Sequence, residues 1–441
     1  MGRQGVPDRP HGPRQGAGGD RPLPGTDGRV PAVAPVSERA DAVVVGAGII
    51  GAATAFNLAR LGVRRVLVLE RDGVAAHASR LSAGLVRTHY GNAPEARLAL
   101  AGLHWFENWG ELVGGDPGFH RTGLINPVAR EDQEKLRRNV AMLQSVGVET
   151  TLVGPEELVE LEPDMRVEED ELAAYEPRSG YADPGATTRA LAAAAVGLGV
   201  DVRQGVTVTA ITVEGDRVTG VKTSGGAISA PVVVLANGAW SVPLAAAVGV
   251  QVPIETVGVR LAFVRRPSGM RPGWGGHVVV LDRAHGAYTR AEDEDLSMIG
   301  LAGARVPLSG PDAYAAEAPP SASFAAVALG QVARRFPSFA GAPVVRGHSG
   351  PIDLTPDLCA IIDGVQPEGL YLGVGMSGSG FKKGPAIGQC LAELIVEGEA
   401  RTAPIHDFRL SRFAEGDPIR SEGYVIAPES VSVLGPANMV H

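Results

Sequence analysis

Three glycines follow an apolar run in the stretch VVVGAGIIGAATAFNLARLGVRRVLVLER. Gly46, Gly48 and Gly51 have the GxGxxG spacing that lets a backbone turn tightly and approach a pyrophosphate at the positive end of the following helix. Glu70 comes roughly 20 residues later, where a carboxylate can accept hydrogen bonds from a ribose hydroxyl. The spacing therefore predicts a dinucleotide site, and a glycine-rich turn in an ordinary βαβ unit is the alternative.

The elements on either side of the glycines must hold them in place. The run AVVV before Gly46 has no polar interruption, which is typical of a strand buried on both faces of a parallel sheet. Small and apolar residues then follow in a helical pattern, which Gly62 is expected to end before a second strand at Val66–Leu69. A bare GxGxxG occurs by chance in a chain with 59 glycines, whereas the complete unit is much more specific.

The composition is that of an ordinary globular protein with two or three domains. The chain has 441 residues, of which 44% are hydrophobic and 20% are charged. Its net charge of -9 argues against nucleic acid or an anionic membrane as the main partner, although a local basic cleft can still bind a small anion. No run of about 18 apolar residues occurs, so we expect no membrane-spanning helix.

The two ends of the chain differ from its middle. Residues 1–38 are rich in Pro, Gly and Arg, so we expect a disordered extension without a secretory signal. The tail 414–441 is irregular, and its segment YVIAPESVSVLG is expected to pack on the folded body or on a neighbouring subunit of an oligomer. Cys359 and Cys390 are expected to be buried thiols rather than a disulfide, which fits a reducing, cytoplasmic location.

Helical and strand patterns alternate along the rest of the chain. Helices are predicted around Leu98–Trp109, at 132–146, in the alanine-rich stretch after Pro184 and at 325–335. Strands are predicted at 201–203, 232–236 and repeatedly between 251 and 303, with a hairpin turn at Gly215–Asp216. The strands at 201–203 and 232–236 are expected to extend the first sheet. The nucleotide domain is therefore predicted to be discontinuous and interrupted by a substrate domain.

Four segments together carry a resemblance to a known family. They are VVVGAGIIGAATAFNLARLG followed by Glu70, SRLSAGLVRTHYG, VVVLANGAWS and LTPDLCAIIDGVQPEGLYLGVGMSGSGFKKGPAIGQCLAELI. From about 41 to 413 the chain resembles the D-amino-acid oxidase superfamily of FAD flavoproteins, in its sarcosine oxidase and glycine oxidase-like branch. The resemblance implies an α/β fold with a Rossmann-like FAD-binding domain (39–90, 178–250 and 345–413). It also implies an α+β substrate domain built on a mainly antiparallel sheet (91–177 and 251–344).

The resemblance implies FAD as the cofactor. The segment SRLSAG offers hydroxyl and amide donors to the pyrophosphate and the flavin ring, and the alternative is an ordinary polar loop. The turn GMSGSG would present main-chain amides to the flavin carbonyl edge, where negative charge builds up on reduction. The implied contacts are Gly46, Gly48, Ile50, Gly51, Glu70, Arg71, Ser79, Arg80, Ser82, Ala83, Gly84, Val206, Gly238, Trp240, Gly350, Gly378, Gly380, Phe381 and Lys382. No metal site is expected.

The resemblance also implies how a substrate is held. Arg87 in LVRTHYG and Lys382 in GSGFKK fall where the sarcosine oxidase-like pattern has two cations that bind the substrate carboxylate. A guanidinium binds a carboxylate through two hydrogen bonds and an ammonium adds a point charge, which fixes the reacting carbon over the flavin. Without the family, each would more often be a solvated surface cation. His89 and His348 are further candidates for the catalytic pocket, although lone histidines are usually structural.

Some positions depart from the family pattern. Gly350 and Leu81 stand where relatives attach FAD through Cys or His, so we expect non-covalent FAD. Ile352 stands where relatives often have a substrate-binding Arg or Tyr, which implies a larger or more apolar pocket. Met298 stands where sarcosine oxidases have a Lys that activates dioxygen, which weakens the case for a fast oxidase.

These residues together imply an enzyme that oxidises a secondary or N-methyl amine or amino acid to an imine. Hydride transfer to the flavin would be followed by reoxidation by dioxygen or another acceptor. An FAD-dependent 2-hydroxy-acid dehydrogenase would use the same two cations. A third hypothesis is a flavoprotein subunit of a multi-subunit sarcosine oxidase-like complex, and a non-catalytic binding module is the fourth.

Overall fold

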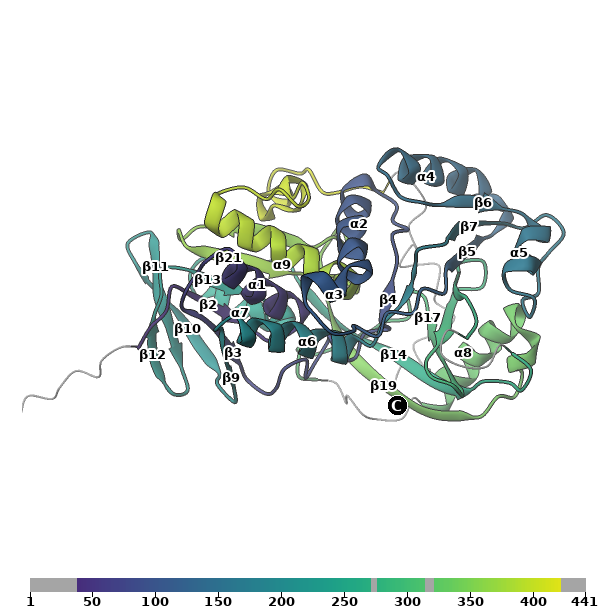
Figure 1. Ribbon diagram of the computed structural model, residues 1–441, viewed down its shortest axis with the longest axis horizontal. Coiled ribbons are helices and arrows are strands. Elements are labelled where there is room, and N and C mark those ends of the chain that lie inside the picture. Colours follow the sequence, from purple (N-terminus) through teal and green to yellow (C-terminus); the bar gives the residue numbers. More distant parts are fainter. Residues whose placement is uncertain (1–37, 271–275, 314–320, 422–441) are drawn as a thin grey trace, which may run out of the picture. The chain divides into compact units, whose positions relative to one another are not determined.

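The computed structural model describes residues 38–270, 276–313 and 321–421. The predicted extension 1–38, apart from Glu38, and the segment YVIAPESVSVLG lie outside the described residues. Among the described residues, most strands belong to sheets of six, four and nine strands, and β4 (Leu85–Val86) pairs with β8 (Gly180–Tyr181) in a small fourth sheet. Figure 1 shows the ribbon with many of these strands and the helices labelled.

The six-stranded sheet contains the strands on either side of the glycine turn. Its order is β20-β21-β13-β2-β3-β9, parallel except for the pair β20 and β21. The strands are β2 (Ala42–Val45), β3 (Val66–Glu70), β9 (Asp201–Gln204), β13 (Val233–Leu235), β20 (Ile361–Val365) and β21 (Leu370–Val374). Because these strands come from three separate parts of the chain, the sheet is discontinuous in sequence. The two remote strands β9 and β13 join it as predicted.

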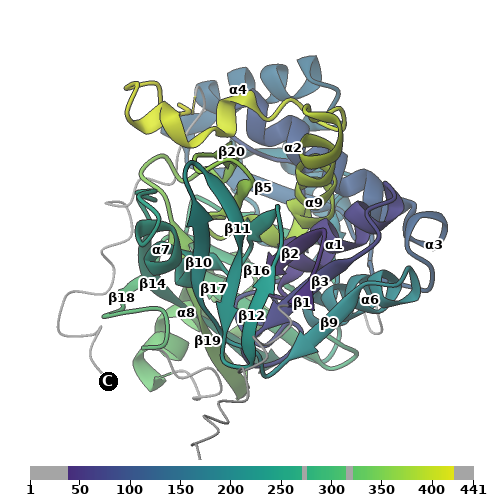
Figure 2. The ribbon, with the colours of Figure 1, turned by 90° about the vertical axis from the view of Figure 1, so that its left-hand side faces the viewer.

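Both faces of this sheet are covered, as its unbroken apolar strands predict. Val44, Val68 and Val234 pack with helices on one face. Those helices are α1 (Ile49–Arg60), α6 (Pro184–Gly197) and α9 (Gly380–Glu397), with α2 (Ala93–Glu107) packed on α9. Val43 and Leu67 on the other face join the core of the four-stranded sheet. Figure 2 shows that sheet in front of the six-stranded one.

The four-stranded sheet has the order β1-β12-β11-β10. Its strands are β1 (Glu38–Arg39), β10 (Val208–Glu214), β11 (Arg217–Thr223) and β12 (Gly226–Ser229). The hairpin β10–β11 turns at Gly215 and Asp216 as predicted, and Gly215 has a φ of 63°. The hairpin builds a separate layer rather than lengthening the first sheet, because its apolar residues lie on one face and pack down onto that sheet.

The nine-stranded sheet is the second half of the fold. Its order is β18-β14-β17-β16-β15-β5-β7-β6, and β19 pairs with β14. The strands are β5 (Leu124–Val128), β6 (Thr151–Val153), β7 (Leu172–Glu176), β14 (Glu255–Arg265), β15 (Val279–Asp282), β16 (Ala287–Ala291), β17 (Leu296–Leu301), β18 (Val306–Pro307) and β19 (Val344–Leu354). Neighbours are antiparallel except β15 and β5, which confirms a mainly antiparallel sheet.

The remaining elements are short or surround this second sheet. The helices are α3 (Trp109–Leu112), α4 (Gln133–Ser145), α5 (Pro155–Leu161), α7 (Ser241–Ala246) and α8 (Ala322–Arg335). The 3-10 helices are η1 (Arg130–Asp132), η2 (Gly238–Trp240), η3 (Pro337–Phe339), η4 (His406–Phe408) and η5 (Leu410–Phe413). Helix α2 begins at Ala93, earlier than predicted, because the Asn92 side chain accepts a hydrogen bond from the backbone N–H of Glu95 at 2.9 Å and caps the helix.

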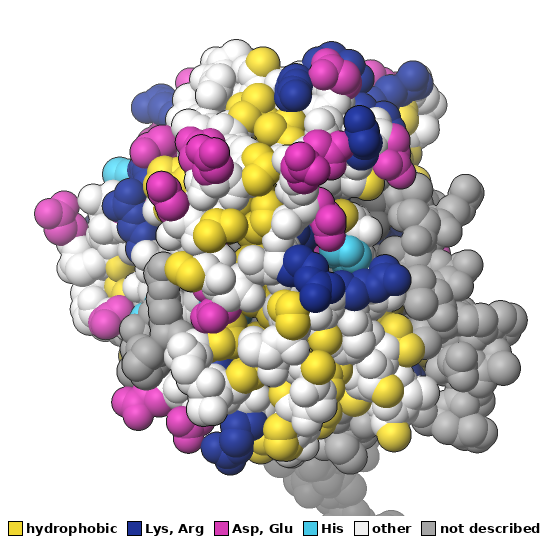
Figure 3. Space-filling model, turned by 90° about the vertical axis from the view of Figure 1, so that its right-hand side faces the viewer, with side chains coloured by type: hydrophobic (Ala, Val, Ile, Leu, Met, Phe, Trp, Pro, Cys, Tyr) yellow, Lys and Arg dark blue, Asp and Glu magenta, His cyan; other side chains and the backbone are white. Residues whose placement is uncertain are grey.

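Two simpler expectations concern the chain as a whole. Cys359 and Cys390 are buried free thiols, as predicted. In the described part of the chain, no helix has the length and hydropathy needed to cross a membrane. On the side of α4, α5 and α8, acidic and basic side chains are mixed with hydrophobic ones (Figure 3), so this face does not gather charge of one sign.

Candidate functional site

A cavity of about 730 Å³ lies between the six-stranded and nine-stranded sheets. The carboxyl ends of β2, β3, β13 and β21 reach one side of it, through residues such as Gly46, Glu70 and Gly238. Strands β14, β16 and β19 form the other side, through residues such as Leu261 and Tyr288. Ligands of open α/β sheets bind at the carboxyl ends of the strands, so the cavity lies where the glycine turn predicts a nucleotide.

The glycine turn fits a pyrophosphate group. Gly46 has a φ of 102°, and a Cβ atom there would lie 2.8 Å from the carbonyl oxygen of Ala236. A Cβ atom at Gly51 would lie 1.9 Å from the carbonyl oxygen of Gly46. Helix α1 has no side-chain cap and no acidic residue in its first turn. Gly48, Ile49 and Ile50 at the start of α1 line the cavity, where the positive end of the helix dipole favours an anion such as the pyrophosphate of FAD.

Side chains beside the turn fit the rest of a dinucleotide. Glu70 is buried, and its carboxylate accepts hydrogen bonds from the backbone N–H groups of Ala47 and Asp72 at 2.8 and 2.9 Å. These two bonds hold the carboxylate at the cavity wall, where a ribose hydroxyl can reach its remaining lone pairs. The Ser79 hydroxyl accepts a hydrogen bond from Ile49 N–H at 2.9 Å, which brings the SRLSAG loop to the start of α1.

Three side chains meet at the rim of the cavity. The Arg71 guanidinium lies 5.1 Å from the centre of the Trp240 ring. Asp312 accepts hydrogen bonds from both residues, at 2.9 Å from Arg71 and 3.0 Å from the Trp240 indole. The segment that carries Asp312 is thereby joined to the nucleotide-binding half of the fold.

Most of the predicted cofactor contacts line this cavity. They are Gly46, Gly48, Ile50, Glu70, Arg71, Ser79, Ser82, Ala83, Val206, Gly238, Trp240, Gly350, Gly378, Gly380, Phe381 and Lys382. Gly51, Arg80 and Gly84 do not line it. Gly51 packs against the turn itself, Arg80 is exposed, and Gly84 lies where a Cβ atom would be 2.3 Å from the carbonyl oxygen of Ala182. Gly51 and Gly84 are therefore needed for close backbone packing.

Arg87 and Lys382 both line the cavity. Lys382 is only 6% exposed, and within the described residues its ammonium makes no hydrogen bond or ion pair. Burial holds the pKa of Lys382 well below its usual value, and the nearby cations Arg87 and Lys383 lower it further. The Arg87 guanidinium lies 4.4 Å from the centre of the Tyr90 ring and donates to the carbonyl oxygen of His89. In the described chain, neither cation is paired with a carboxylate.

The neighbouring lysine has a different environment. Lys383 is fully buried and forms an ion pair with Glu95, which keeps its pKa above the usual value against the cost of burial. Helix α2 carries Glu95 and approaches α9 closely at Gly102, where a Cβ atom would lie 2.1 Å from the carbonyl oxygen of Lys382. The contact between α2 and α9 thus places Lys383 in the core beside Glu95 and leaves Lys382 at the cavity.

The structure does not bring His89 or His348 to the cavity. His89 is buried beside Asn139, whose amide nitrogen is 3.1 Å from Nε2, and burial holds its pKa well below the usual value. The Nε2 atom of His348 lies 3.2 Å from the carbonyl oxygen of Leu81, and its ring packs near Phe263. Both positions fit the alternative that these histidines have a structural role rather than a catalytic one. Met298 is likewise buried in the core outside the cavity.

Several charged residues that line the cavity were missed from the sequence, among them Asp353 and Arg305. Asp353 is buried, and its Oδ2 atom accepts a hydrogen bond from Gly375 N–H at 2.7 Å. Burial raises the pKa of Asp353 to about 6. Arg305 is half-buried at the cavity wall, and burial lowers its pKa. Neither lies in a glycine-rich or repeated motif, so no local pattern distinguishes them from loop residues.

Comparison with known proteins agrees with this geometry. The family model described as FAD dependent oxidoreductase (DAO) matches residues 41–394. Sarcosine oxidase subunit beta of Arthrobacter sp is 30% identical over 394 residues, which cover 87% of this chain and 93% of that protein. The formaldehyde-forming 4-methylaminobutanoate oxidase of Paenarthrobacter nicotinovorans is 31% identical over 382 residues, 82% of this chain. The match covers only 44% of that longer relative.

Solved structures show the same fold. L-proline dehydrogenase from P. horikoshii has a TM-score of 0.80 at 24% identity, covering 87% of this chain and 100% of that one. Glycine oxidase from Geobacillus kaustophilus has a TM-score of 0.74 at 26% identity, covering 85% of this chain and 99% of that one. With the glycine turn, the acid at the end of β3 and the cavity at the strand ends, these matches confirm the predicted fold and FAD cofactor. The chain belongs to the DAO family of FAD-dependent oxidoreductases.

Proposed function

We propose that this chain oxidises the carbon–nitrogen bond of a small amine that also carries a carboxylate. The observation that carries this proposal is the pair Arg87 and Lys382, two cations on one cavity wall without a carboxylate partner among the described residues. Lys382 is buried and Arg87 is half-buried, and charges removed from water without an opposite charge are costly, so such a pair favours an anionic ligand. The names of the relatives, a sarcosine oxidase subunit and a glycine oxidase, support an amino-acid substrate.

Each residue has a distinct part in the proposed reaction. Arg87 binds the substrate carboxylate and Lys382 adds a second positive charge beside it. The apolar side chains of Ile352, Leu261 and Tyr288 exclude water from the rest of the substrate. Bound FAD supplies a two-electron acceptor. A secondary or N-methyl amino acid, or a cyclic imino acid, would give a hydride from the carbon next to nitrogen to this acceptor and its N–H proton to solvent, and would leave as an imine, which water hydrolyses.

The FAD is proposed to be bound without a covalent link. Gly350 and Leu81 face one another at the cavity, because a Cβ atom on Gly350 would lie 2.8 Å from the Cβ atom of Leu81. Neither residue offers a sulfur or ring nitrogen for attachment. Denaturation with acid is expected to release all yellow colour into the supernatant, and colour kept in the precipitated protein would contradict the proposal.

The test is anaerobic bleaching of the flavin absorbance by sarcosine, proline, pipecolate, glycine and a 2-hydroxy acid in turn. Arg87→Met and Lys382→Met should each lower the second-order rate of bleaching by an amino acid by about 10- to 100-fold, the usual worth of a hydrogen bond to a charged group. The rate of bleaching by the methyl ester of the same amino acid should fall much less in these variants. Lys222→Met, which removes an exposed lysine on β11, is the matched control.

The outcomes separate the hypotheses. An equal loss with acid and ester would overturn the carboxylate role of the two cations. Bleaching by the 2-hydroxy acid alone would replace amine oxidation with hydroxy-acid oxidation. The rate at which air restores the colour then shows whether dioxygen is the electron acceptor.

The match over nearly all of a sarcosine oxidase subunit supports a second proposal, that the chain acts with partner subunits. Sedimentation of a tagged copy purified gently from its native cells should then show a complex larger than one chain with stoichiometric companions. A homogeneous monomer with full bleaching activity would argue against it.

A further inference from the structure

The turn between β21 and α9 is tied to the end of β19. The backbone N–H of Gly375 donates to the Asp353 carboxyl at 2.7 Å, and the N–H of Ser377 donates to the Asp353 carbonyl oxygen at 3.0 Å. Ser377 has a φ of 50°, a left-handed conformation that costs a residue with a side chain about 1 kcal/mol or more. The turn therefore keeps its shape only because its neighbours hold it.

Thr355 supplies the next contact. Its backbone N–H donates to the Ser377 hydroxyl at 3.1 Å, and the two hydroxyl oxygens are 3.2 Å apart. The Thr355 hydroxyl also donates to the carbonyl oxygen of Cys359 at 2.7 Å. The side chain of Thr355 is buried. One residue thus fixes the strained Ser377 and the following loop at the same time.

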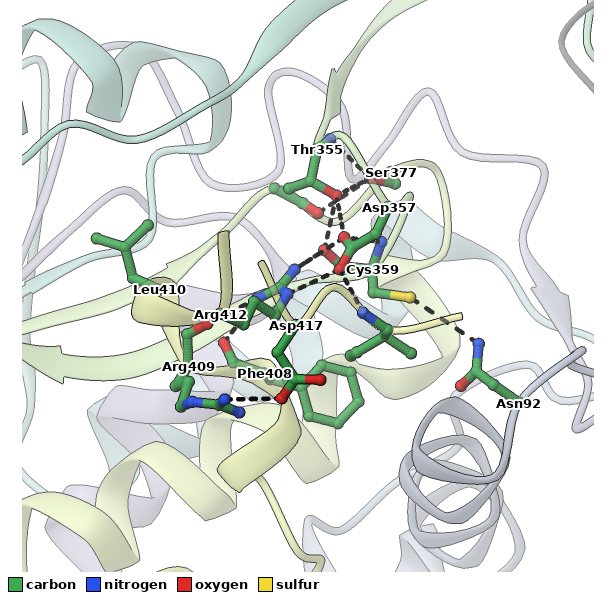
Figure 4. A network of polar contacts seen from close by, with 12 residues as sticks. Asn92, Thr355, Asp357, Cys359, Ser377, Phe408, Arg409, Leu410, Arg412 and Asp417 are labelled. Atoms are coloured by element: carbon green, nitrogen blue, oxygen red, sulfur yellow. Dashed lines mark hydrogen bonds and ion pairs between the residues drawn. The ribbon is translucent and has the colours of Figure 1, made fainter. Parts of the chain in front are cut away.

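A buried ion pair joins this loop to the C-terminal segment, defined here as residues 405–419. Arg412 is fully buried and donates to both carboxylate oxygens of Asp357, at 2.8 and 2.9 Å. It also donates to the carbonyl oxygens of Cys359 and Phe408, at 2.9 and 3.0 Å. Figure 4 shows the Arg412 side chain of the C-terminal segment directed at Asp357, with Thr355 and Ser377 on the other side of Asp357.

We infer that Thr355 and Arg412 are positioning residues for the FAD. Arg412 and the Thr355 hydroxyl both donate to the carbonyl oxygen of Cys359, and Thr355 in turn holds Ser377. The two residues therefore connect the C-terminal segment to the turn whose residues Gly378 and Gly380 line the cofactor cavity. The inference rests on the FAD of the family and not on the amine substrate. It can therefore hold or fail independently of the proposed reaction.

The physical consequence concerns the charge of the flavin. Main-chain N–H groups held at a fixed place stabilise negative charge that develops next to them, because no reorganisation is needed. The family resemblance directs the N–H groups of this turn to the flavin edge that becomes negative on reduction. A loosened turn should therefore weaken the binding of FAD and make the bound flavin harder to reduce.

Thr355→Val is the sharpest test, because valine keeps the shape of threonine and removes only the hydroxyl. In the purified holoenzyme, the dissociation constant of FAD should rise about fivefold, the equivalent of one hydrogen bond. The midpoint potential of the bound flavin, measured against reference dyes, should become more negative. Thr355→Ser keeps the hydroxyl and should stay near the wild type in both measurements.

A matched control separates positioning from ordinary stabilisation. Thr219→Val removes a hydroxyl that bonds the Thr212 hydroxyl at 3.2 Å in the hairpin β10–β11. This control should lower the melting temperature without changing the FAD dissociation constant or the midpoint potential. If Thr355→Val behaves in the same way as Thr219→Val, the hydroxyl of Thr355 is only structural and the inference is overturned.

A second variant tests the far end of the connection. Arg412→Lys keeps a positive charge but loses the paired hydrogen bonds to Asp357. Its FAD dissociation constant and midpoint potential should shift in the same direction as those of Thr355→Val. A folded Arg412→Lys protein with wild-type values in both would show that the C-terminal segment does not position the cofactor, even if Thr355 does.

Discussion

Adjacent lysines at the start of α9 have opposite surroundings. Lys383 pairs with Glu95, whereas the Lys382 ammonium has no partner among the described residues and reaches the cavity. Because burying a charge without an opposite charge nearby is costly, the pKa of Lys382 is lowered in the ligand-free protein. An arriving carboxylate supplies the missing compensation, which gives the site its preference for anions.

This lowered pKa predicts how ligand binding depends on pH. A carboxylate stabilises the protonated form of Lys382, so its binding should take up a proton, and its affinity should fall as the pH rises through the lowered pKa. The measurement is the dissociation constant of acetate, read from the flavin spectrum between about pH 6 and pH 10. Lys382→Met should bind acetate more weakly and without this pH dependence. An unchanged pH dependence in that variant would exclude Lys382 as its source.

Asp353 predicts a pH dependence of stability. Burial raises its pKa from 3.8 to about 6. Because the folded protein holds this proton more tightly than the unfolded chain, the carboxyl stabilises the fold fully below pH 3.8, and this contribution is lost as the pH rises through about 6. The whole titration corresponds to about 3 kcal/mol.

Asp353→Asn should remove this dependence, because asparagine can still accept from Gly375 but cannot ionise. Urea unfolding of the FAD-free proteins from about pH 5 to pH 8 should show the variant gaining stability relative to the wild type as the pH rises. A constant difference between the two proteins would mean that Asp353 does not titrate in this range.

At the scale of elements, the site depends on how closely helices pack. A Cβ atom on Gly388 of α9 would lie 2.4 Å from the Cβ atom of Ala53 on α1. Small residues at this crossing let α9 lie against the helix that begins at the glycine turn. The start of α9 carries Lys382, so the same packing brings the substrate cation to the end of the sheet that binds the nucleotide.

The crossing of α1 and α9 gives a test with a built-in control. Gly388→Ala forces the two helices apart and should destabilise the protein by about 1–3 kcal/mol. Gly330→Ala, in the interior of α8, adds a methyl group where nothing lies within 4 Å. It should stabilise by up to about 1 kcal/mol, the helix propensity of alanine over glycine. Chemical denaturation of both variants gives the sign of the change in the free energy of unfolding. Changes of the same sign in both variants would contradict the close packing of α1 and α9.

At the scale of the whole molecule, the cavity belongs to neither sheet alone. The glycine turn, Glu70 and the turn before α9 come from the nucleotide half, while β14, β16 and β19 supply the opposite wall. A ligand that fills this space contacts both halves of the fold. Binding of FAD should therefore stabilise the molecule as one cooperative unit.

The size of this effect can be predicted from mass action. At a free FAD concentration of about 100 times the dissociation constant, the folded state should gain about 2.7 kcal/mol. Scanning calorimetry should show a single transition whose midpoint rises with FAD. Gly46→Ala, which places a Cβ atom 2.8 Å from Ala236, should lose most of this rise. Two separate transitions, of which only one responds to FAD, would contradict the shared cavity.

The sequence by itself was enough for the parts of the molecule that local patterns control. The strand, glycine turn, helix, strand and Glu70 form one contiguous unit, and only glycine can adopt the backbone that this turn requires. The apolar strands could be predicted from their hydrophobic periodicity and the hairpin at Gly215 from its turn residues, because these signals are also local in the sequence. The family resemblance added FAD and the candidate cations, which the motif alone does not identify.

Only the tertiary structure decided which of these residues meet. His89 and Lys382 each lie in a candidate motif, but only Lys382 lines the cavity. Helix α2 carries Glu95, which pairs with the neighbouring Lys383 in the core. His89 is instead enclosed beside Asn139. Asp353 and Arg412 had no distinguishing pattern, because their partners lie 22 and 55 residues away in the chain. Burial and long-range pairing depend on how distant segments of the chain pack together, which a local sequence pattern does not specify.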